Sequence, residues 1–288
     1  TLKPSLAAKK SGGGDYLSLC KNFHVPLFEV ENINDQQSIK LLKELSLDLA
    51  FVIGWTQIIR EEALKLVNVG MIGAHASLLP HNRGSAPINW VLINGEKQTG
   101  NSLIWLAEGV DSGDIIDQTP FPITPYDTCA SLYQLVAVSN RDMILRVLPK
   151  LIAGERPGHP QSRIDEPILP RRRPNDGRID WTKESCAVYD FVRALTRPYP
   201  GAFSWLDGKR WIIWQCALVP VGGFSDKKPG EVLGPLQSPN EEVCGQVVAC
   251  GKGVLLLLEL EGESSEILRG RQLSEKPWQG SVWLNEHE

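Results

Sequence analysis

Two side chains of this 288-residue chain, those of His75 and Asp111, are suited to moving protons near neutral pH. Imidazole is the side chain whose ordinary pKa lies closest to neutrality, so it can both donate and accept a proton there. A carboxylate beside an imidazole orients the ring and favours its charged form. If the fold brings the two side chains together in a cleft, they form a pair suited to general acid–base catalysis.

Each of the two residues lies on a loop next to an apolar strand. Residues 71–74 predict a β-strand that ends at His75, and α/β proteins place their ligands at such strand ends. Asp111 lies in the turn 109–114 (GVDSGD), between two expected strands at 101–107 and 114–123. A histidine at a strand end and an aspartate in a turn are also common structural features, so their spacing alone does not establish catalysis.

A longer motif surrounds the pair. Residues 75–100 read HASLLPHNRGSAPINWVLINGEKQTG, and residues 111–118 read DSGDIIDQ. This ordered pattern resembles the signature of the folate-dependent formyltransferases, which move a formyl group from N10-formyltetrahydrofolate to an amine. The resemblance continues through RRRPNDGRIDW at 171–181 and FVRALTRPYPGAFSW at 191–205, so it covers nearly the whole chain.

The resemblance implies roles for individual residues. His75 would stabilise the oxyanion and protonate the leaving nitrogen of the folate, while Asp111 would orient the imidazole and collect the proton of the amine. The pterin ring would lie in an apolar slot edged by backbone groups of residues 107–111. Folate contacts are expected from Trp55, Ser77, Leu78, Leu79, Pro80, Arg83, Gly109 and Val110. A core position for Trp55 and a structural salt bridge for Arg83 fit the sequence equally well.

One position departs from the family pattern. Most relatives have an asparagine two residues before the histidine, and the side-chain amide of that asparagine donates to the formyl oxygen. This chain has Gly73 at that position. Loss of one such donor typically costs about 3 kcal/mol of transition-state stabilisation. A backbone N–H group, a water molecule or another amide, such as Asn82 or Asn89, could replace it. A slow enzyme and a protein that hydrolyses the formyl donor are the other interpretations.

The composition favours a small-molecule substrate. The chain has 30 lysines and arginines against 34 acidic residues, a net charge of −4, and no long basic run. Because phosphate contacts supply much of the affinity for nucleic acid, tRNA is disfavoured as a substrate. The six cysteines form no C-x-x-C pair, and we expect no metal site and no nicotinamide cofactor. We also expect no membrane span and a cytoplasmic location.

The pattern of elements predicts an α/β fold with two domains. Residues 1–200, including a linker at 155–181, are expected to form the catalytic domain, a Rossmann-like formyltransferase fold with a mostly parallel sheet. The first β-α-β unit of the family is expected to be absent from this sequence. After residue 200 the chain changes to short strands and turns such as Asp207-Gly208, so residues 201–288 predict a small β-barrel. The resemblance implies that this barrel is OB-like.

The identity of the amine acceptor is the most open question. The run Arg171-Arg172-Arg173 could grip a phosphate group, although such runs are commonly solvated. The sequence is most similar to formyltransferases of nucleotide-linked amino sugars, such as the formyltransferase domain of the bifunctional UDP-4-amino-4-deoxy-arabinose enzyme. We therefore expect a nucleotide-linked amino sugar as the acceptor.

Other interpretations of the sequence stay open. Methionyl-tRNA formyltransferase is the second, and a formyltransferase acting on a carrier-bound amino acid is compatible with the same motifs. Gly73 favours a third interpretation, in which the protein is a degenerate folate-binding protein or resembles a 10-formyltetrahydrofolate hydrolase. We consider a homodimer as a candidate assembly.

Overall fold

The structure is a computed structural model of the chain, and it describes residues 1–4, 15–220 and 226–284. The chain divides into two compact units, each of which is assembled from several segments. Unit 1 comprises Thr1–Pro87, Thr99–Pro122 and Leu135–Pro170, and unit 2 comprises Ile88–Gln98, Ile123–Gln134 and Arg171–Glu288.

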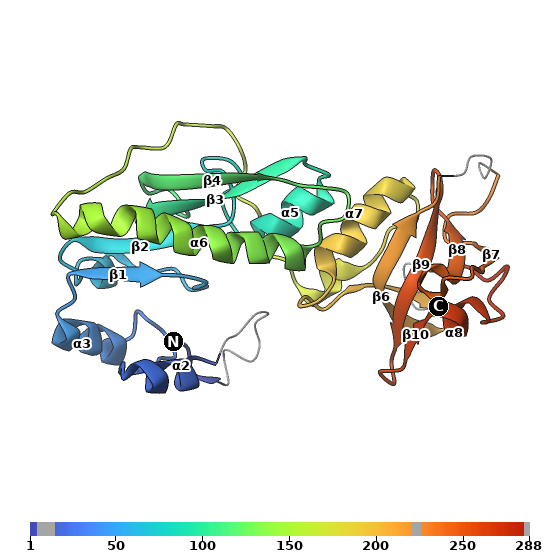
Figure 1. Cartoon of the computed structure of the whole chain (residues 1–288), viewed down its shortest axis with the longest axis horizontal. Coiled ribbons are helices and arrows are strands. Elements are labelled where there is room, and N and C mark those ends of the chain that lie inside the picture. The colour runs from blue at the N-terminus through green and yellow to red at the C-terminus, as the bar shows by residue number, and fades with distance from the viewer. Residues whose placement is uncertain (5–14, 221–225, 285–288) are drawn as a thin grey trace. The chain divides into compact units, whose positions relative to one another are not determined.

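Unit 1 is built on a four-stranded sheet with helices packed on both faces (Figure 1). Across the sheet the strands lie in the order β1 (Leu49–Val52), β2 (Gly70–His75), β3 (Gln98–Trp105) and β4 (Ile115–Pro122). The helices are α2 (Tyr16–Phe23), α3 (Gln36–Leu45), α4 (Glu61–Leu64) and most of α6 (Cys129–Ile152). Asp15 and Asp35 begin α2 and α3 by accepting hydrogen bonds from backbone N–H groups of the first turn, as N-cap aspartates do.

The sheet of unit 1 is mixed. β1 and β2 run parallel, whereas β2 and β3 run antiparallel, with His75 opposite Ser102. β4 then folds back along β3, and the N–H of Trp105 donates to the carbonyl of Asp114. The expected α/β class is confirmed, but the sheet is not mostly parallel in the described residues. The reason is that β3 runs antiparallel to β2, and that a turn, rather than a crossover helix, connects β3 to β4.

β2 alternates its side chains between the two faces of the sheet. Met71 packs on one face, in a cluster with residues of α3 and of the segment 59–67 (Ile39, Ile59, Ala63 and Val67). Ile72 packs on the other face against Leu103, Trp105 and two residues of α6 (Met143 and Val147). The same alternation places Gly73 and His75 on the face of Met71, so both belong to the α3 and α4 side of the sheet.

Unit 2 contains an antiparallel sheet that follows the path β5–β6–β9–β8–β7, with β10 paired to β9. Its strands are β5 (Ala202–Leu206), β6 (Lys209–Leu218), β7 (Val232–Leu236), β8 (Gly245–Ala249), β9 (Val254–Gly262) and β10 (Ile267–Arg269). Its helices are most of α5 (Pro87–Ile93), α7 (Ser185–Leu195), α8 (Gly270–Ser274) and the short η1 (Pro174–Gly177) and η2 (Glu241–Val243). Asp207 and Gly208 both have positive φ and form the expected hairpin turn between β5 and β6.

Residues 280–284 join the two edges of this strand path. Leu284 exchanges two backbone hydrogen bonds with Trp205 of β5. On the other side, the N–H of Trp283 donates to Gly230, and the N–H of Val232 in β7 donates to Ser281. A sheet whose edges are joined in this way leaves fewer strand edges open to solvent. The C-terminal β domain is thus confirmed, while its OB-like type stays a prediction.

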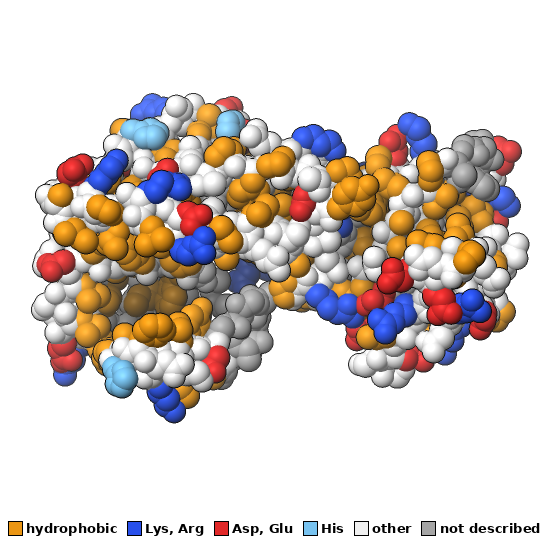
Figure 2. Space-filling model, viewed as in Figure 1, with side chains coloured by type: hydrophobic (Ala, Val, Ile, Leu, Met, Phe, Trp, Pro, Cys, Tyr) orange, Lys and Arg blue, Asp and Glu red, His pale blue; other side chains and the backbone are white. Residues whose placement is uncertain are grey.

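Several large apolar side chains on unit 1 are exposed (Figure 2). They include five residues of α2 and the segment that follows it (Tyr16, Leu17, Leu19, Phe23 and Val25), together with Phe51 on the edge strand β1. Among the helices of the described residues, none is both long enough and apolar enough to cross a bilayer.

The buried Asn101 connects β3 to α6 within unit 1. Its amide donates to Ser139 Oγ at 3.0 Å and to Asn140 Oδ1 at 2.6 Å, and the residue is fully buried. We expect Asn101→Ala to lower the free energy of unfolding by about 2 kcal/mol, because buried acceptors lose their donor. Urea denaturation followed by circular dichroism measures this change. Gln37→Ala, which removes an exposed amide of the same unit, should change it by less than about 0.5 kcal/mol; equal effects would contradict the assigned role.

Candidate active site

His75 is the last residue of β2, and only 7% of its surface is exposed. Its Nε2 lies 2.8 Å from the carbonyl oxygen of Asn82 and donates to it, because a carbonyl oxygen only accepts. Its Nδ1 lies 3.4 Å from Oδ2 of Asp111. In the neutral ring this nitrogen has a lone pair directed toward the carboxylate, and it carries a proton there in the imidazolium form.

Asp111 lies in the turn between β3 and β4 and has a φ of +48°. Aspartate tolerates this left-handed conformation better than most residues. The same Oδ2 that faces His75 accepts a hydrogen bond of 2.9 Å from the N–H of Gly84. Gly84 has a φ of +114°, and a Cβ there would lie 2.5 Å from the carbonyl oxygen of Leu169. Glycine at this position therefore lets the backbone reach the carboxylate.

Ser102, on β3, fixes the loop that follows His75. Its Oγ donates to the carbonyl of Ser77 at 2.7 Å and accepts from the N–H of Leu79 at 3.1 Å. Gln118 on β4 donates both to this hydroxyl, at 2.7 Å, and to the carbonyl of Leu79, at 3.0 Å. Ser77 and Leu79 are themselves buried, so β3 and β4 hold this part of the loop through Ser102 and Gln118.

Residues 157–170, here called the bracing segment, contact the turn that carries Asp111. Gln161 donates through Nε2 to the carbonyls of Asp111, at 2.7 Å, and Gly113, at 2.8 Å. The indole N–H of Trp105 donates to Pro157 at 2.7 Å, which holds the start of the bracing segment against β3. The sequence predicts only a linker here, because no periodic apolar pattern marks the segment.

The bracing segment also contacts the loop that follows His75. Glu166 accepts from Nδ1 of His81 at 2.6 Å and from the N–H of Asn82 at 3.4 Å. The hydrogen bond from His81 is the main reason that the pKa of Glu166 lies below its usual value. Further along, the N–H of Leu169 donates to Arg83 and its carbonyl accepts from Ser85. One segment thus holds both loops of the candidate site.

Of the residues expected to contact folate, several have structural contacts of their own. Ser77 donates to the carbonyl of His81 at 2.7 Å, and Leu79 packs in a buried cluster with Ile104 and Ile115. Arg83 donates through Nε to the carbonyl of Pro80 at 3.3 Å. Leu78 and Pro80 are half-buried, and Gly109 and Val110 are exposed. The proposed folate contacts of all these residues stay predictions.

The turn before Asp111 offers free backbone groups. In the part of the chain that the structure describes, no hydrogen bond engages the backbone N–H groups of residues 107–110. Trp55 packs beside the cluster around Met71, as does Leu106, and its indole N–H is buried with no partner among the described residues. The folate contacts expected for Trp55 and for this turn stay predictions.

Leu106 fills the space beside Gly73. A Cβ added at Gly73 would overlap Cδ2 of Leu106, which packs with the cluster around Met71. The side-chain amide that the resemblance predicts at this position therefore has no room unless Leu106 moves. Of the two substitute amides considered from the sequence, Asn89 is fully buried in unit 2 and donates to the carbonyl of Ala194 at 2.6 Å.

The three arginines at 171–173 differ in their environments within unit 2. The guanidinium of Arg172 lies over the rings of Trp90 and Phe191, 5.0 Å and 5.5 Å from their centroids. It also donates to the carbonyl of Asp176, and burial lowers its pKa. Arg171 and Arg173 are exposed. Arg172 is thus the most engaged of the three, and a substrate role for the run stays a prediction.

Known protein families match both parts of the chain. A sequence profile described as formyl transferase matches residues 4–148, and a profile described as formyl transferase, C-terminal domain, matches residues 172–277.

Three solved structures illustrate the similarity in fold. HypX from Aquifex aeolicus, in complex with tetrahydrofolic acid, is 23% identical, with a TM-score of 0.62 over 85% of this chain and 44% of that chain. An N-formyltransferase from Helicobacter canadensis, in complex with folinic acid and dTDP-3-aminofucose, is 19% identical, with a TM-score of 0.59 over 84% and 81%. Methionyl-tRNA formyltransferase from Clostridium thermocellum is 20% identical, with a TM-score of 0.56 over 72% and 88%. The chain spans less than half of the length of HypX.

The two hydrogen bonds of Gln161 generate a prediction. We expect Gln161→Ala to lower the free energy of unfolding by about 1 kcal/mol, because two carbonyls of the Asp111 turn lose their donor. Backbone amide chemical shifts should change in residues 109–114 and at Gly84. Urea denaturation and two-dimensional NMR measure the two effects. Gln37→Ala is the matched control, and an unperturbed Asp111 turn in the Gln161 variant would show that the bracing segment does not hold it.

The contact between Gly73 and Leu106 generates a second prediction. Gly73→Asn should lower the free energy of unfolding by about 1–3 kcal/mol, because the new side chain overlaps Leu106. In a protein that already carries Leu106→Ala, the same change should be less destabilising by about 1 kcal/mol or more, as expected for residues in contact. A double-mutant cycle by urea denaturation measures this coupling. Strictly additive effects would contradict the overlap.

Proposed function

This chain belongs to the formyl transferase family, and from that premise we propose that it transfers a formyl group from N10-formyltetrahydrofolate to the amine of a nucleotide-linked amino sugar. The observation that carries the proposal is the 3.4 Å contact between His75 Nδ1 and Asp111 Oδ2 at the end of β2. Beside this pair, the turn before Asp111 has backbone N–H groups that no described residue engages.

Formyl transfer is an acyl transfer, so the site must manage one oxyanion and one proton. The nitrogen of the acceptor attacks the formyl carbon, a C–N bond forms, and the bond from that carbon to N10 of the folate breaks. Across the reaction one proton passes from the acceptor amine to N10. In this proposal Asp111 accepts the amine proton, and His75, as imidazolium, donates its Nε2 proton to N10. The ring then keeps its proton on Nδ1, so Nε2 regains a proton from solvent and Asp111 releases the amine proton to solvent, which restores both groups.

The Nε2–H of His75 is the donor that faces the reacting group in this scheme. In the structure it is bonded to the carbonyl of Asn82, so a substrate oxygen or nitrogen takes the place of that carbonyl. Gly73 supplies no side-chain amide, and Leu106 occupies the adjacent space. More of the oxyanion stabilisation therefore falls to His75 and to the N–H groups of residues 107–110.

Two observations support an amino sugar as the acceptor. One solved relative, the Helicobacter canadensis N-formyltransferase, was crystallised with dTDP-3-aminofucose. The net charge of −4 argues against an extended tRNA-binding face, whereas the exposed Arg171 and Arg173 are sufficient for a diphosphate. Methionyl-tRNA formyltransferase is the second candidate, supported by the similarity to the Clostridium thermocellum enzyme. A homodimer and a cytoplasmic location stay predictions.

Single-turnover mixing of the protein with N10-formyltetrahydrofolate and one acceptor at a time tests the proposal. The acceptors are UDP- and dTDP-linked amino sugars and methionyl-tRNA, with mass spectrometry as the readout. A formylated sugar nucleotide supports the proposal. Formylation of methionyl-tRNA alone would make methionyl-tRNA the acceptor in place of the sugar. Folate binding with no transfer identifies the protein as a folate binder, and release of formate by transfer of the formyl group to water identifies it as a hydrolase.

Substitution of the acid–base pair gives the sharpest prediction for this site. We expect His75→Ala and Asp111→Asn each to lower the single-turnover rate by about 100- to 10,000-fold, because each removes a proton-transfer group. Circular dichroism should show that both variants stay folded. His24→Asn and Asp142→Asn, which change exposed or half-exposed residues away from the pair, should keep the full rate. A near-normal rate in either site variant would exclude the assigned role.

A further inference from the structure

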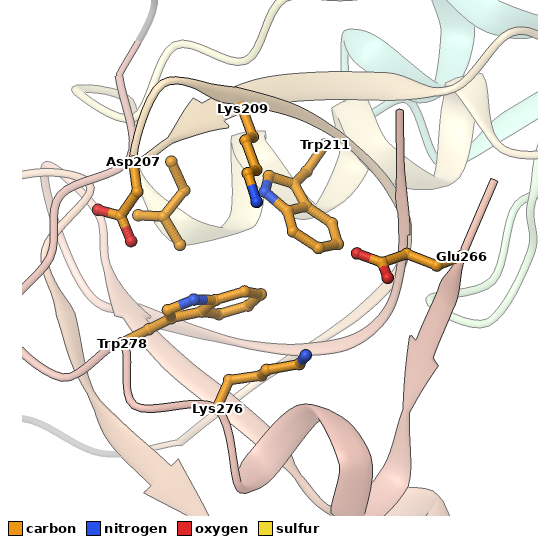
Figure 3. Close-up of a pocket in the computed structure, with 7 residues that line it drawn as sticks. Asp207, Lys209, Trp211, Glu266, Lys276 and Trp278 are labelled. Atoms are coloured by element: carbon orange, nitrogen blue, oxygen red, sulfur yellow. The ribbon is translucent and has the colours of Figure 1, made fainter. Parts of the chain in front are cut away.

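The β domain of unit 2 contains a hollow that the proposed reaction does not use (Figure 3). It has a volume of about 150 Å³ and lies at the hairpin between β5 and β6. Its lining comes from three separate stretches of chain: the hairpin itself, the residue that precedes β10, and the segment that follows α8. Besides the buried Leu206, the side chains are those of Asp207, Lys209, Trp211, Glu266, Lys276 and Trp278.

Two indole rings that contact each other edge to face line this hollow (Figure 3). The rings of Trp211 and Trp278 are 5.2 Å apart and nearly perpendicular, at 69°. Trp211 is buried, whereas Trp278 is partly exposed and also contacts the buried Trp283, at 6.1 Å. Trp278 is thus supported by a buried aromatic cluster and presents apolar surface to the hollow.

The segment that carries Lys276 and Trp278 is held rigidly. Gln246, a fully buried residue of β8, donates through Nε2 to the carbonyls of Leu273, Ser274 and Lys276, at 3.1, 3.1 and 2.9 Å. The N–H of Trp278 donates to the carbonyl of Lys276. A platform fixed before the ligand arrives loses little conformational entropy on binding.

The charges around the hollow are balanced. Two ammonium groups, of Lys209 and Lys276, and two carboxylates, of Asp207 and Glu266, lie on its lining. Across the described part of the chain, none of these four side chains makes an ion pair or a hydrogen bond. Figure 3 shows the carboxylate of Glu266 directed toward the two indoles. The lining therefore offers both free donors and free acceptors, and its two positive and two negative charges leave no net charge.

From these features we infer that the hollow binds one uncharged sugar ring, as a free monosaccharide or as the end of a glycan. The C–H face of a pyranose is apolar and matches the exposed indole of Trp278, while its hydroxyl groups both donate and accept. A phosphate or nucleotide would be attracted by the two lysines but repelled by the two carboxylates on the same lining. An organic cation would be attracted by the carboxylates and repelled by the lysines. The volume is suited to a single ring rather than to an extended chain.

This site is independent of formyl transfer. All of its lining residues belong to unit 2, and the acid–base pair belongs to unit 1. His75→Ala should therefore leave sugar binding unchanged, even if the proposed reaction is wrong.

Saturation-transfer NMR on the full chain tests the inference. The probes are methyl glycosides of common hexoses and N-acetylhexosamines, and trisaccharides that end in the same sugars. UMP is the anionic comparator, and inorganic phosphate, which has no carbon-bound protons to observe, is added as a competitor of UMP. We expect at least one neutral sugar to bind saturably. Trp278→Ala should weaken its binding by about tenfold or more, because the apolar contact is lost. Glu266→Gln should weaken it by roughly fivefold, because a charged acceptor becomes neutral.

Matched variants decide the outcome. Trp205→Ala removes a partly exposed tryptophan of the same domain that does not line the hollow, and it should leave sugar binding unchanged. If Trp278→Ala fails to fold, Glu266→Gln, which alters an exposed side chain, still reports on the site. The inference is overturned if no sugar of the panel binds, if only UMP or phosphate binds, or if binding is indifferent to both Trp278 and Glu266. Binding of a trisaccharide without its methyl glycoside supports a glycan end rather than a free sugar.

Discussion

One carboxylate organises the candidate active site. Oδ2 of Asp111 lies between a side-chain nitrogen of His75 and the backbone N–H of Gly84, so it connects the end of β2 to the far end of the loop that follows it. This arrangement depends on two unusual backbone conformations, at Asp111 and at Gly84, which both have positive φ. Because backbone and side chain share one acceptor atom, the position of the imidazole and the path of the loop are set together.

In both units a glutamine side-chain amide holds a chain segment by donating to its backbone carbonyls. A glutamine amide has two N–H groups, and each can bind a different carbonyl. Gln161 uses its amide to hold the turn of Asp111, and Gln246 uses its amide to hold the segment of Trp278. In both cases the segment held has little regular structure, so it lacks the hydrogen bonds that a helix or strand would provide. The amide supplies them and defines the geometry of a candidate binding surface.

The sequence predicts some of this well and some not at all. The strand that ends at His75 and the turn of Asp111 follow from apolar runs and glycines, and the pairing of the two residues was expected from resemblance rather than from spacing. The antiparallel direction of β3 and β4 was missed, since an apolar strand pattern carries no direction. Gln161 and Glu166 could not be found, because polar residues of a Pro-rich stretch look the same whether they are solvated or bonded. The overlap of Leu106 with Gly73 is a matter of three-dimensional packing alone.

The segmented make-up of the two units has a practical consequence. The backbone passes from one unit to the other at residue 88, returns at 99, passes again at 123, returns at 135 and passes for the last time at 171. No single cleavage or stop codon can therefore release either unit with all of its parts. During synthesis, the early segments of unit 2 emerge long before the strands that complete it. Both units are therefore incomplete at the same time on the nascent chain. Attempts to dissect this protein by truncation would remove stability from whichever half was meant to be kept.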